Sequence, residues 1–103
     1  MKRYINLNAK DFIEQLQTDN DAILLDVRSR KEYSENHLTN SINIPVTDQE
    51  KLLGLDKTKK YYFHCRVGGR SAMAAHLLVQ EGFEHVYNLN DDLANAFDYI
   101  QFK

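Results

Sequence analysis

The stretch of residues 60–82 reads KYYFHCRVGGRSAMAAHLLVQEG, and it predicts a strand, a loop and a helix in immediate succession. The aromatic run at 61–63 favours a strand, which is expected over residues 60–65. A helix is expected over residues 71–81, because the glycine that follows, Gly82, is suited to end it. A strand joined to a helix in this way is the unit from which parallel sheets are built.

The sequence on either side continues the alternation of strands and helices. The apolar run at 22–27 is typical of a strand that is covered on both faces. Helix starts are indicated by Asn8 and by two capping boxes, Ser29 with Glu32 and Thr47 with Glu50. In all, further strands are expected over 4–7, 22–27, 41–44 and 84–89, and further helices over 8–17, 29–35, 47–54 and 93–100. We therefore predict an α/β fold with a central, mostly parallel sheet of about five strands and helices on both faces.

Length and composition restrict the class of protein. The 103 residues suffice for one domain, which is expected to span 1–103. The chain has 13 lysines and arginines against 15 aspartates and glutamates, a net charge of −2, which argues against a protein built mainly to bind nucleic acid or acidic membranes. No apolar run approaches the roughly 20 residues of a membrane span, and no signal peptide is indicated. We expect a cytoplasmic protein, and we expect it to be a monomer.

The chain has a single cysteine, Cys65. One thiol excludes an internal disulfide framework and a zinc site built from several cysteines of one chain. Cys65 is therefore either an inert core residue or a nucleophile. It stands where a predicted parallel strand ends, and ligands bind beyond the carboxyl ends of strands in such sheets.

The loop after Cys65 concentrates features that stabilise an anion. The predicted helix directs the positive end of its dipole at the loop. Gly68 and Gly69 can take positive φ and turn successive N–H groups inward. Arg66 and Arg70 add two permanent positive charges with planar groups that suit oxyanions. Together these effects favour the thiolate form of Cys65, which is the nucleophilic form.

We accordingly predict that Cys65 is the catalytic nucleophile of a covalent mechanism. No metal ion and no cofactor are predicted to take part. The main side-chain contact to an anionic substrate is expected to be Arg70. The full set of predicted substrate-binding residues is Arg66, Val67, Gly68, Gly69, Arg70 and Ser71.

The segment Cys65–Arg70 fits the pattern C-x-x-G-x-R, and through it the chain resembles the rhodanese family of sulfurtransferases, in particular its small single-domain members. The resemblance extends over most of the chain. Stretches similar to the family's motifs are Asp26-Val27-Arg28, Glu32-Tyr33, His37-Leu38, Ser41-Ile42-Asn43-Ile44-Pro45 and residues 71–82. The chain departs from the family at Asn36 and Asn40, where glycine is frequent, and at Asn90-Asp91-Asp92 and Phe97, in place of a usual Gly-Gly pair and a tryptophan.

The resemblance implies a transfer of sulfur in two steps. The Cys65 thiolate would attack the outer sulfur of thiosulfate or a similar donor, release sulfite and become a persulfide. A thiophilic acceptor, either cyanide or a protein thiol, would then remove the added sulfur. The implied partners are thus a small anionic sulfur donor and a thiophilic acceptor.

Three other functions stay open at this point. The domain could be a persulfide carrier with little turnover of its own, a regulatory module that binds a partner, or a cysteine-dependent phosphatase or arsenate reductase. Phosphatases use a C-x5-R loop of seven residues, whereas Cys65 to Arg70 counts six. The shorter loop makes a narrower ring of N–H groups, which suits a single sulfur atom better than a phosphate.

The residues beside the loop have simpler expected roles. Adjacent residues of a strand point to opposite faces, so the ring of His64 is expected to point away from the sulfur and to serve the structure. Asp26 and Arg28 follow a neighbouring strand on the same side of the sheet. They are expected either to orient the loop or to pair with each other or with Glu32.

Overall fold

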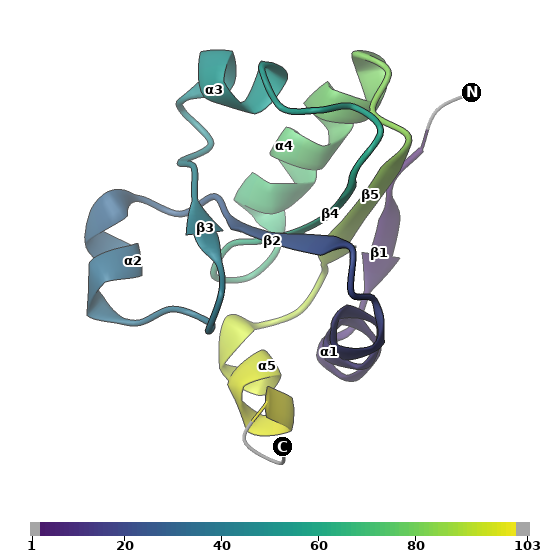
Figure 1. The fold of residues 1–103 in the computed structure, drawn as a ribbon. Coiled ribbons are helices and arrows are strands. Elements are labelled where there is room, and N and C mark those ends of the chain that lie inside the picture. Colours follow the sequence, from purple (N-terminus) through teal and green to yellow (C-terminus); the bar gives the residue numbers. More distant parts are fainter. Residues whose placement is uncertain (1–2, 101–103) are drawn as a thin grey trace.

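The computed structural model describes residues 3–100 and shows a five-stranded sheet in which all neighbouring strands are parallel. The strand order is β1-β5-β4-β2-β3, so β4 lies at the centre (Figure 1). The strands are β1 (Ile5–Leu7), β2 (Ala22–Asp26), β3 (Ile42–Asn43), β4 (Lys60–His64) and β5 (His85–Leu89). The predicted α/β fold with a parallel central sheet is confirmed.

Helices cover both faces of the sheet (Figure 1). They are α1 (Ala9–Thr18), α2 (Arg30–Glu35), α3 (Gln49–Leu53), α4 (Gly69–Gln80) and α5 (Leu93–Ile100). Because side chains alternate along a strand, β4 contributes to two hydrophobic clusters. Tyr61 and Phe63 pack with α3 and α4, and Tyr62 packs with α1 and α5 on the other face. No helix in residues 3–100 is long and apolar enough to cross a membrane.

Most helix starts lie where the capping signals predict them. Asn8 accepts a hydrogen bond from the Asp11 N–H, and the capping box of Ser29 and Glu32 forms in full. The prediction for α3 is wrong by one residue, because Asp48 and not Thr47 is its N-cap. The carboxylate of Asp48 accepts from the Lys51 N–H, and aspartate caps a helix at least as well as threonine.

The helix after the central strand also begins earlier than the sequence predicts. It starts at Gly69, two residues before Ser71, with Gly68 as its N-cap at φ 104°. The left-handed conformation of Gly68 closes the turn so tightly that the helix follows at once. Ser71 therefore lies inside the first turn of α4, where its side chain can reach back to the loop.

The carboxyl ends of β2 and β4 lie side by side, and they carry two of the buried polar residues. Asp26 is in register with His64, the last residue of β4. Beyond this edge of the sheet lie α2 and the loop that leads into α4 (Figure 1). Since α2 buries none of its residues, polar contacts must hold it against this edge.

Candidate active site

Cys65 directly follows β4 and directs its sulfur into the turn that begins α4. The Gly68 N–H donates to Sγ at 3.1 Å, and the Ser71 hydroxyl lies 3.4 Å from Sγ. The Ser71 hydroxyl is also 3.3 Å from the Gly68 carbonyl oxygen, so its single proton is available to one acceptor at a time. The thiol is free, and the residue is only 2% exposed.

Two opposing effects set the pKa of the Cys65 thiol. Burial raises the pKa, because the thiolate loses its hydration. The hydroxyl and N–H of Ser71 and the N–H groups of Gly68 and Val67 lower it, because they donate to the anion. The donors outweigh burial, and the pKa lies below the ordinary value for a cysteine. The thiolate expected from the sequence is thus supported by donors in the structure.

Gly68 is required for this arrangement. Its φ of 104° is in the left-handed region, and a Cβ at this position would lie 3.0 Å from the Leu89 carbonyl oxygen. Gly69 differs, since its φ is not positive and a Cβ there would meet nothing within 4 Å. The expectation of positive φ therefore holds for Gly68 and is wrong for Gly69, which is already the first residue of α4.

Arg70 and Arg66 occupy different environments. The Arg70 guanidinium forms a two-pronged contact with Glu32 of α2, at 2.7 Å and 3.0 Å. Glu32 raises the pKa of Arg70 most, and the Cys65 thiolate also raises it, so the charge of Arg70 lies within electrostatic reach of the sulfur. Arg66 is exposed, and its side chain has no ion pair within residues 3–100.

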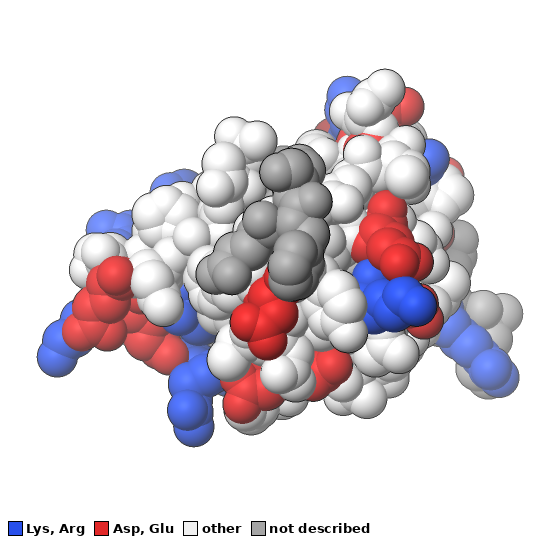
Figure 2. Space-filling model, turned by 90° about the horizontal axis from the view of Figure 1, so that it is seen from below, with Lys and Arg blue, Asp and Glu red and all other residues white. Residues whose placement is uncertain are grey.

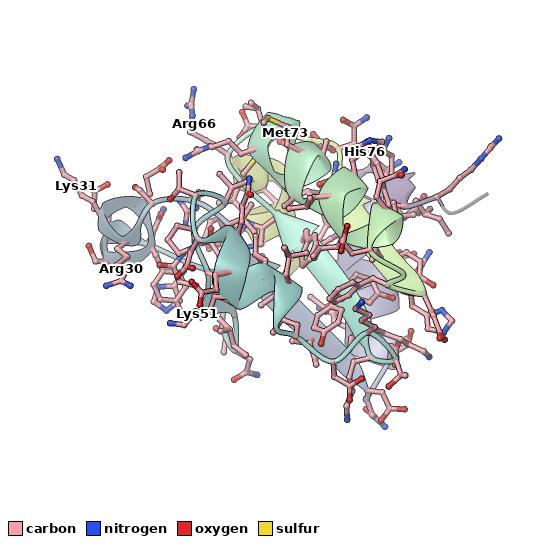
Figure 3. The ribbon with its side chains drawn as sticks, turned by 90° about the horizontal axis from the view of Figure 1, so that it is seen from above. Arg30, Lys31, Lys51, Arg66, Met73 and His76 are labelled. Carbon is pink, nitrogen blue, oxygen red and sulfur yellow. The ribbon has the colours of Figure 1, made fainter. Side chains whose placement is uncertain are left out.

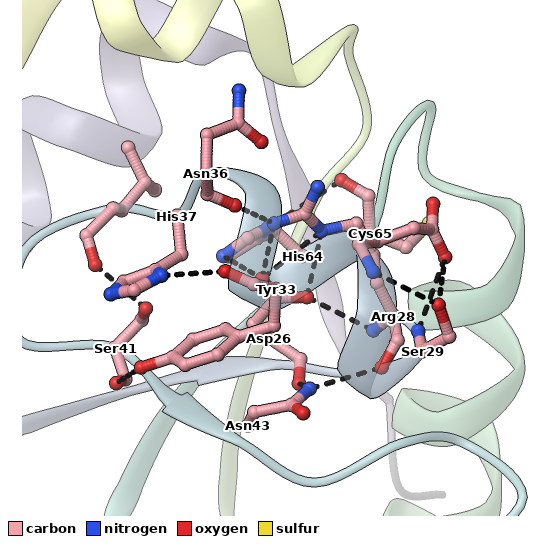
Figure 4. A network of polar contacts seen from close by, with 12 residues as sticks. Asp26, Arg28, Ser29, Tyr33, Asn36, His37, Ser41, Asn43, His64 and Cys65 are labelled. Carbon is pink, nitrogen blue, oxygen red and sulfur yellow. Dashed lines mark hydrogen bonds and ion pairs between the residues drawn. The ribbon is translucent and has the colours of Figure 1, made fainter.

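A polar network centred on the buried Asp26 and Arg28 lies next to Cys65 (Figure 4). Arg28 donates hydrogen bonds to the Asp26 carboxylate through Nε and Nη2, and the shortest of them is 2.7 Å. Nη2 also donates to the Asn36 carbonyl oxygen. The pairing of Asp26 with Arg28 that the sequence suggested is therefore present. It ties the end of β2 to the segment that follows α2.

His64 lies in this network and is not among the hydrogen-bond partners of the sulfur. Its ring is fully buried, with Nε2 3.9 Å from Asp26 Oδ2 and Nδ1 3.4 Å from the Cys65 carbonyl oxygen. Burial outweighs the attraction of Asp26 and lowers the pKa of His64 to about 4. The neutral ring has an Nε2 without a hydrogen-bond partner among the described residues. The expected structural role of His64 agrees with this placement.

Sequence reasoning missed several contacts that hold the Cys65 loop. The sequence predicts Glu32 as a capping residue and as a possible partner of Arg28, whereas in the structure it also binds Arg70, 38 positions away. Asn88 of β5 places Nδ2 3.5 Å from the Gly68 carbonyl oxygen, and the Leu93 N–H donates to the Arg66 carbonyl oxygen at 2.8 Å. Nothing in the local sequence indicates these pairs, because each depends on how distant elements pack.

Comparison with known proteins places this chain in a family. The model of the Rhodanese-like domain family matches residues 8–95, so the chain belongs to that family. A rhodanese-related protein from Thermoplasma volcanium has the same fold, with a TM-score of 0.78, 33% sequence identity and coverage of 92% of both chains. A thiosulfate sulfurtransferase (GlpE) from Coxiella burnetii is 33% identical over 76 residues, which are 73% of this chain and 71% of the relative.

Other relatives are longer than this chain. A tRNA sulfurtransferase from Thermoplasma acidophilum is 37% identical over 73 residues, which are 71% of this chain but 15% of that protein. A putative sulfur carrier protein (YrkF) from Bacillus subtilis is 31% identical over 84 residues, which are 81% of this chain and 45% of that protein. The family thus includes proteins named as sulfurtransferases and as sulfur carriers.

Proposed function

We propose that this protein is a sulfurtransferase that carries sulfane sulfur as a persulfide on Cys65. In the first step the Cys65 thiolate attacks the outer sulfur of an anionic donor such as thiosulfate. The bond between the two donor sulfurs breaks, and its electron pair leaves with sulfite. The outer sulfur stays bound to Sγ through the electron pair that the thiolate supplied, and it keeps the negative charge that it carried in the donor.

The observation that carries the proposal is the pair of donors on Sγ, the Gly68 N–H and the Ser71 hydroxyl. They stabilise the thiolate before the reaction, and the loop's N–H groups are available to the persulfide anion after it. Donors that are already in place need no reorganisation, which is the usual source of such stabilisation. The active site is proposed to consist of Cys65 and residues 66–71.

The two arginines are proposed to act differently on the donor. Arg66 has no ion pair among the residues that the structure describes, and it would contact the sulfonate end of thiosulfate directly. Arg70 is held by Glu32, so it would stabilise the anion mainly through its charge and would hold the loop against α2. This division differs from the expectation from sequence, in which Arg70 is the main side-chain contact to an anionic substrate.

The second step passes the outer sulfur to a thiophilic acceptor, either cyanide or a protein thiol. Relatives named as thiosulfate sulfurtransferase and as sulfur carrier support two versions of this step, rapid turnover and slow delivery to a partner. The chemistry needs a reduced thiol, so we infer that the protein works in a reducing compartment such as the cytoplasm. As proposed, residues 1–103 act as one domain.

Intact-mass measurement after brief treatment with thiosulfate tests the proposal. Wild-type protein is expected to gain one sulfur atom that dithiothreitol removes, whereas Cys65→Ser gains none. In turnover with cyanide, Arg66→Ala is expected to raise the KM for thiosulfate about tenfold, because it removes one direct charged contact. Rapid turnover would support the enzyme, and stable loading with slow turnover would support the carrier.

The phosphatase alternative makes the opposite prediction in the same samples. Hydrolysis of an aryl phosphate without any gain of sulfur would overturn the proposal and favour a phosphatase. An unchanged KM for thiosulfate in Arg66→Ala, with normal sulfur loading, would show that the proposed role of Arg66 is wrong while the role of Cys65 stands.

A further inference from the structure

The two most exposed large hydrophobic side chains of the described residues both lie close to Cys65 in the chain. Met73 is 70% exposed and Val67 is 56% exposed. Val67 is in the loop itself, and Met73 is one helical turn from the start of α4. Contact with apolar side chains does not favour the binding of a small dianion or of cyanide. Apolar groups beside a reactive sulfur are instead typical of a surface that contacts a protein.

Unpaired cations lie around the same apolar residues. Arg30 and Lys31 open α2, and they directly precede Glu32, whose carboxylate binds Arg70 at the start of α4. That contact neutralises both Glu32 and Arg70. Arg30, Lys31 and Arg66 are exposed, and none of them has an ion pair within residues 3–100.

Figure 3 shows where these three cations lie on the molecule. Seen from above, Arg30 and Lys31 project outward from α2, and Arg66 projects from the loop near Met73 at one end of α4 (Figure 3). Seen from below, acidic and basic side chains are interspersed (Figure 2). The remaining carboxylate of α2, Glu35, is at the far end of that helix.

We propose that Arg30, Lys31, Arg66, Val67 and Met73 form a docking surface for an acidic protein whose thiol takes the sulfur from Cys65. This proposal rests on the proposed function and specifies its acceptor. Carboxylates of the partner would pair with the three cations, and an apolar side chain beside its cysteine would pack on Met73 and Val67. The arrangement suits a partner segment that places its own cysteine at the mouth of the loop.

The transfer at this surface balances without another reactant. The partner's thiolate attacks the outer sulfur of the Cys65 persulfide. The S–S bond to Cys65 breaks, and its electron pair returns to Sγ as thiolate. The partner keeps the outer sulfur as its own persulfide, and this sulfur holds the proton that the partner's thiol lost when it became the thiolate.

A protein fits this surface better than RNA or a second copy of the chain. RNA would bind through phosphates and would leave Met73 and Val67 without a matching group. Two copies brought together by this surface would oppose cations with cations, which is unfavourable. Carboxylates combined with an apolar side chain match both parts of the surface.

Two synthetic peptides with one cysteine each test the proposal directly. In one peptide leucine and several glutamates flank the cysteine, and in the other lysines replace the glutamates. Cys65 is loaded with thiosulfate, the excess is removed, and loss of the added sulfur is followed by intact mass. We expect transfer to the acidic peptide to be about tenfold faster than to the basic peptide at low salt, and less so at high salt.

Matched variants separate docking from chemistry. Arg30→Glu/Lys31→Glu and Met73→Ser are expected to load with sulfur normally and to slow transfer to the acidic peptide severalfold. Lys57→Glu/Lys59→Glu makes the same change of net charge at the amino end of β4, and it is expected to leave transfer unchanged. Dithiothreitol, which is small and uncharged, should react equally with all variants.

The outcomes distinguish the two proposals. Failure of wild-type loading would overturn the proposed function. If loading is normal, three results would overturn the docking surface alone. The first is equal transfer to both peptides, and the second is equal slowing of transfer by the Lys57→Glu/Lys59→Glu control. The third is faster transfer to a transfer RNA than to the acidic peptide. A dimer in sedimentation that Met73→Ser dissociates would also overturn it, because the face would then be occupied by a second copy.

Discussion

Gly68 is the residue at which backbone geometry and the chemistry of the sulfur meet. Its φ of 104° turns the chain from the loop into α4 and aims its own N–H at Sγ. An L-residue is strained in this region, and its Cβ would lie only 3.0 Å from the Leu89 carbonyl oxygen, a contact tighter than usual. The backbone conformation of Gly68 therefore affects both the stability of the turn and the ionisation of Cys65.

Substitution of the two adjacent glycines should have opposite effects on stability. Gly68→Ala is expected to lower the free energy of unfolding by about 2 kcal/mol, because it combines a positive φ with a contact to backbone. Gly69→Ala is expected to leave the free energy of unfolding unchanged or to raise it by up to about 1 kcal/mol. Gly69 is helical, and a Cβ at this position would meet no other atom within 4 Å. Urea denaturation at pH 7 measures both. Equal destabilisation by the two variants would contradict this view of the turn.

At the scale of elements, the helix α2 is held by polar contacts rather than by burial. The N-terminus of α2 is capped by the capping box of Ser29 and Glu32, and the same Glu32 carboxylate binds Arg70 of α4. Tyr33 adds a hydrogen bond of 2.6 Å to the Ser41 carbonyl oxygen. Glu32 thus fixes the start of one helix and joins it to the start of another, beside Cys65.

The Glu32 contact predicts a pH-dependent contribution to stability. Arg70, followed by the donors of Ser29, lowers the pKa of Glu32 from 4.5 to about 2, against a smaller effect of burial. Because the pKa is lower in the folded protein, the stabilisation is complete above pH 4.5 and is lost as the pH falls toward 2. Both side chains are partly exposed, so solvent screening reduces the contribution of this ion pair to the free energy of unfolding to about 1 kcal/mol.

Glu32→Gln measures this contribution. Its free energy of unfolding at pH 7 is expected to be lower than that of the wild type by about 1 kcal/mol, and the difference should shrink between pH 4.5 and pH 2. Glu35→Gln, on the same helix and without an ion pair in the described residues, is the matched control. A difference for Glu32→Gln that stays constant with pH would show that the ion pair contributes little.

The local signals in the sequence predict the elements well and their junctions less well. The capping box at Ser29 is satisfied within four residues, so the sequence alone is enough to place it. Asn40 takes φ 67°, in agreement with the tolerance of asparagine for the left-handed region that made it an acceptable replacement for glycine. The start of α4 depends on the conformation of Gly68, which packing against Leu89 and Asn90 determines.

At the scale of the whole molecule, the buried network under the loop connects three strands and α2. Asp26 of β2 binds Arg28, its backbone carbonyl accepts from Asn43 of β3, and its carboxylate lies near His64 of β4. All of these groups are in the sheet interior or at its carboxyl edge. Through this network, the packing of the sheet influences the position of the Cys65 backbone.

His64 makes the stability of the whole domain sensitive to mild acid. Burial lowers its pKa from 6.5 to about 4, although Asp26 opposes the shift. The unfolded chain thus binds a proton at a higher pH than the folded protein does. Stability from this group is complete above pH 6.5 and is lost as the pH falls to about 4, a loss on the order of 3 kcal/mol.

Urea denaturation of wild type and His64→Asn between pH 7 and pH 4 tests this. The variant is expected to be less stable at pH 7 but to lose less stability over this interval, because asparagine does not titrate. His85→Asn is the control, since His85 is exposed and should keep the wild-type slope. Parallel stability curves for wild type and His64→Asn would mean that another group causes the acid sensitivity.

Local signals are enough to predict the order of strands and helices, the parallel sheet and the loop with Cys65, because apolar periodicity, capping residues and glycines act over a few residues. The contact of Glu32 with Arg70, the buried network of Asp26 and His64 and the exposure of Met73 near the loop become apparent only in the folded chain. These contacts join elements that are distant in the chain, and their geometry follows from how the helices pack on the sheet.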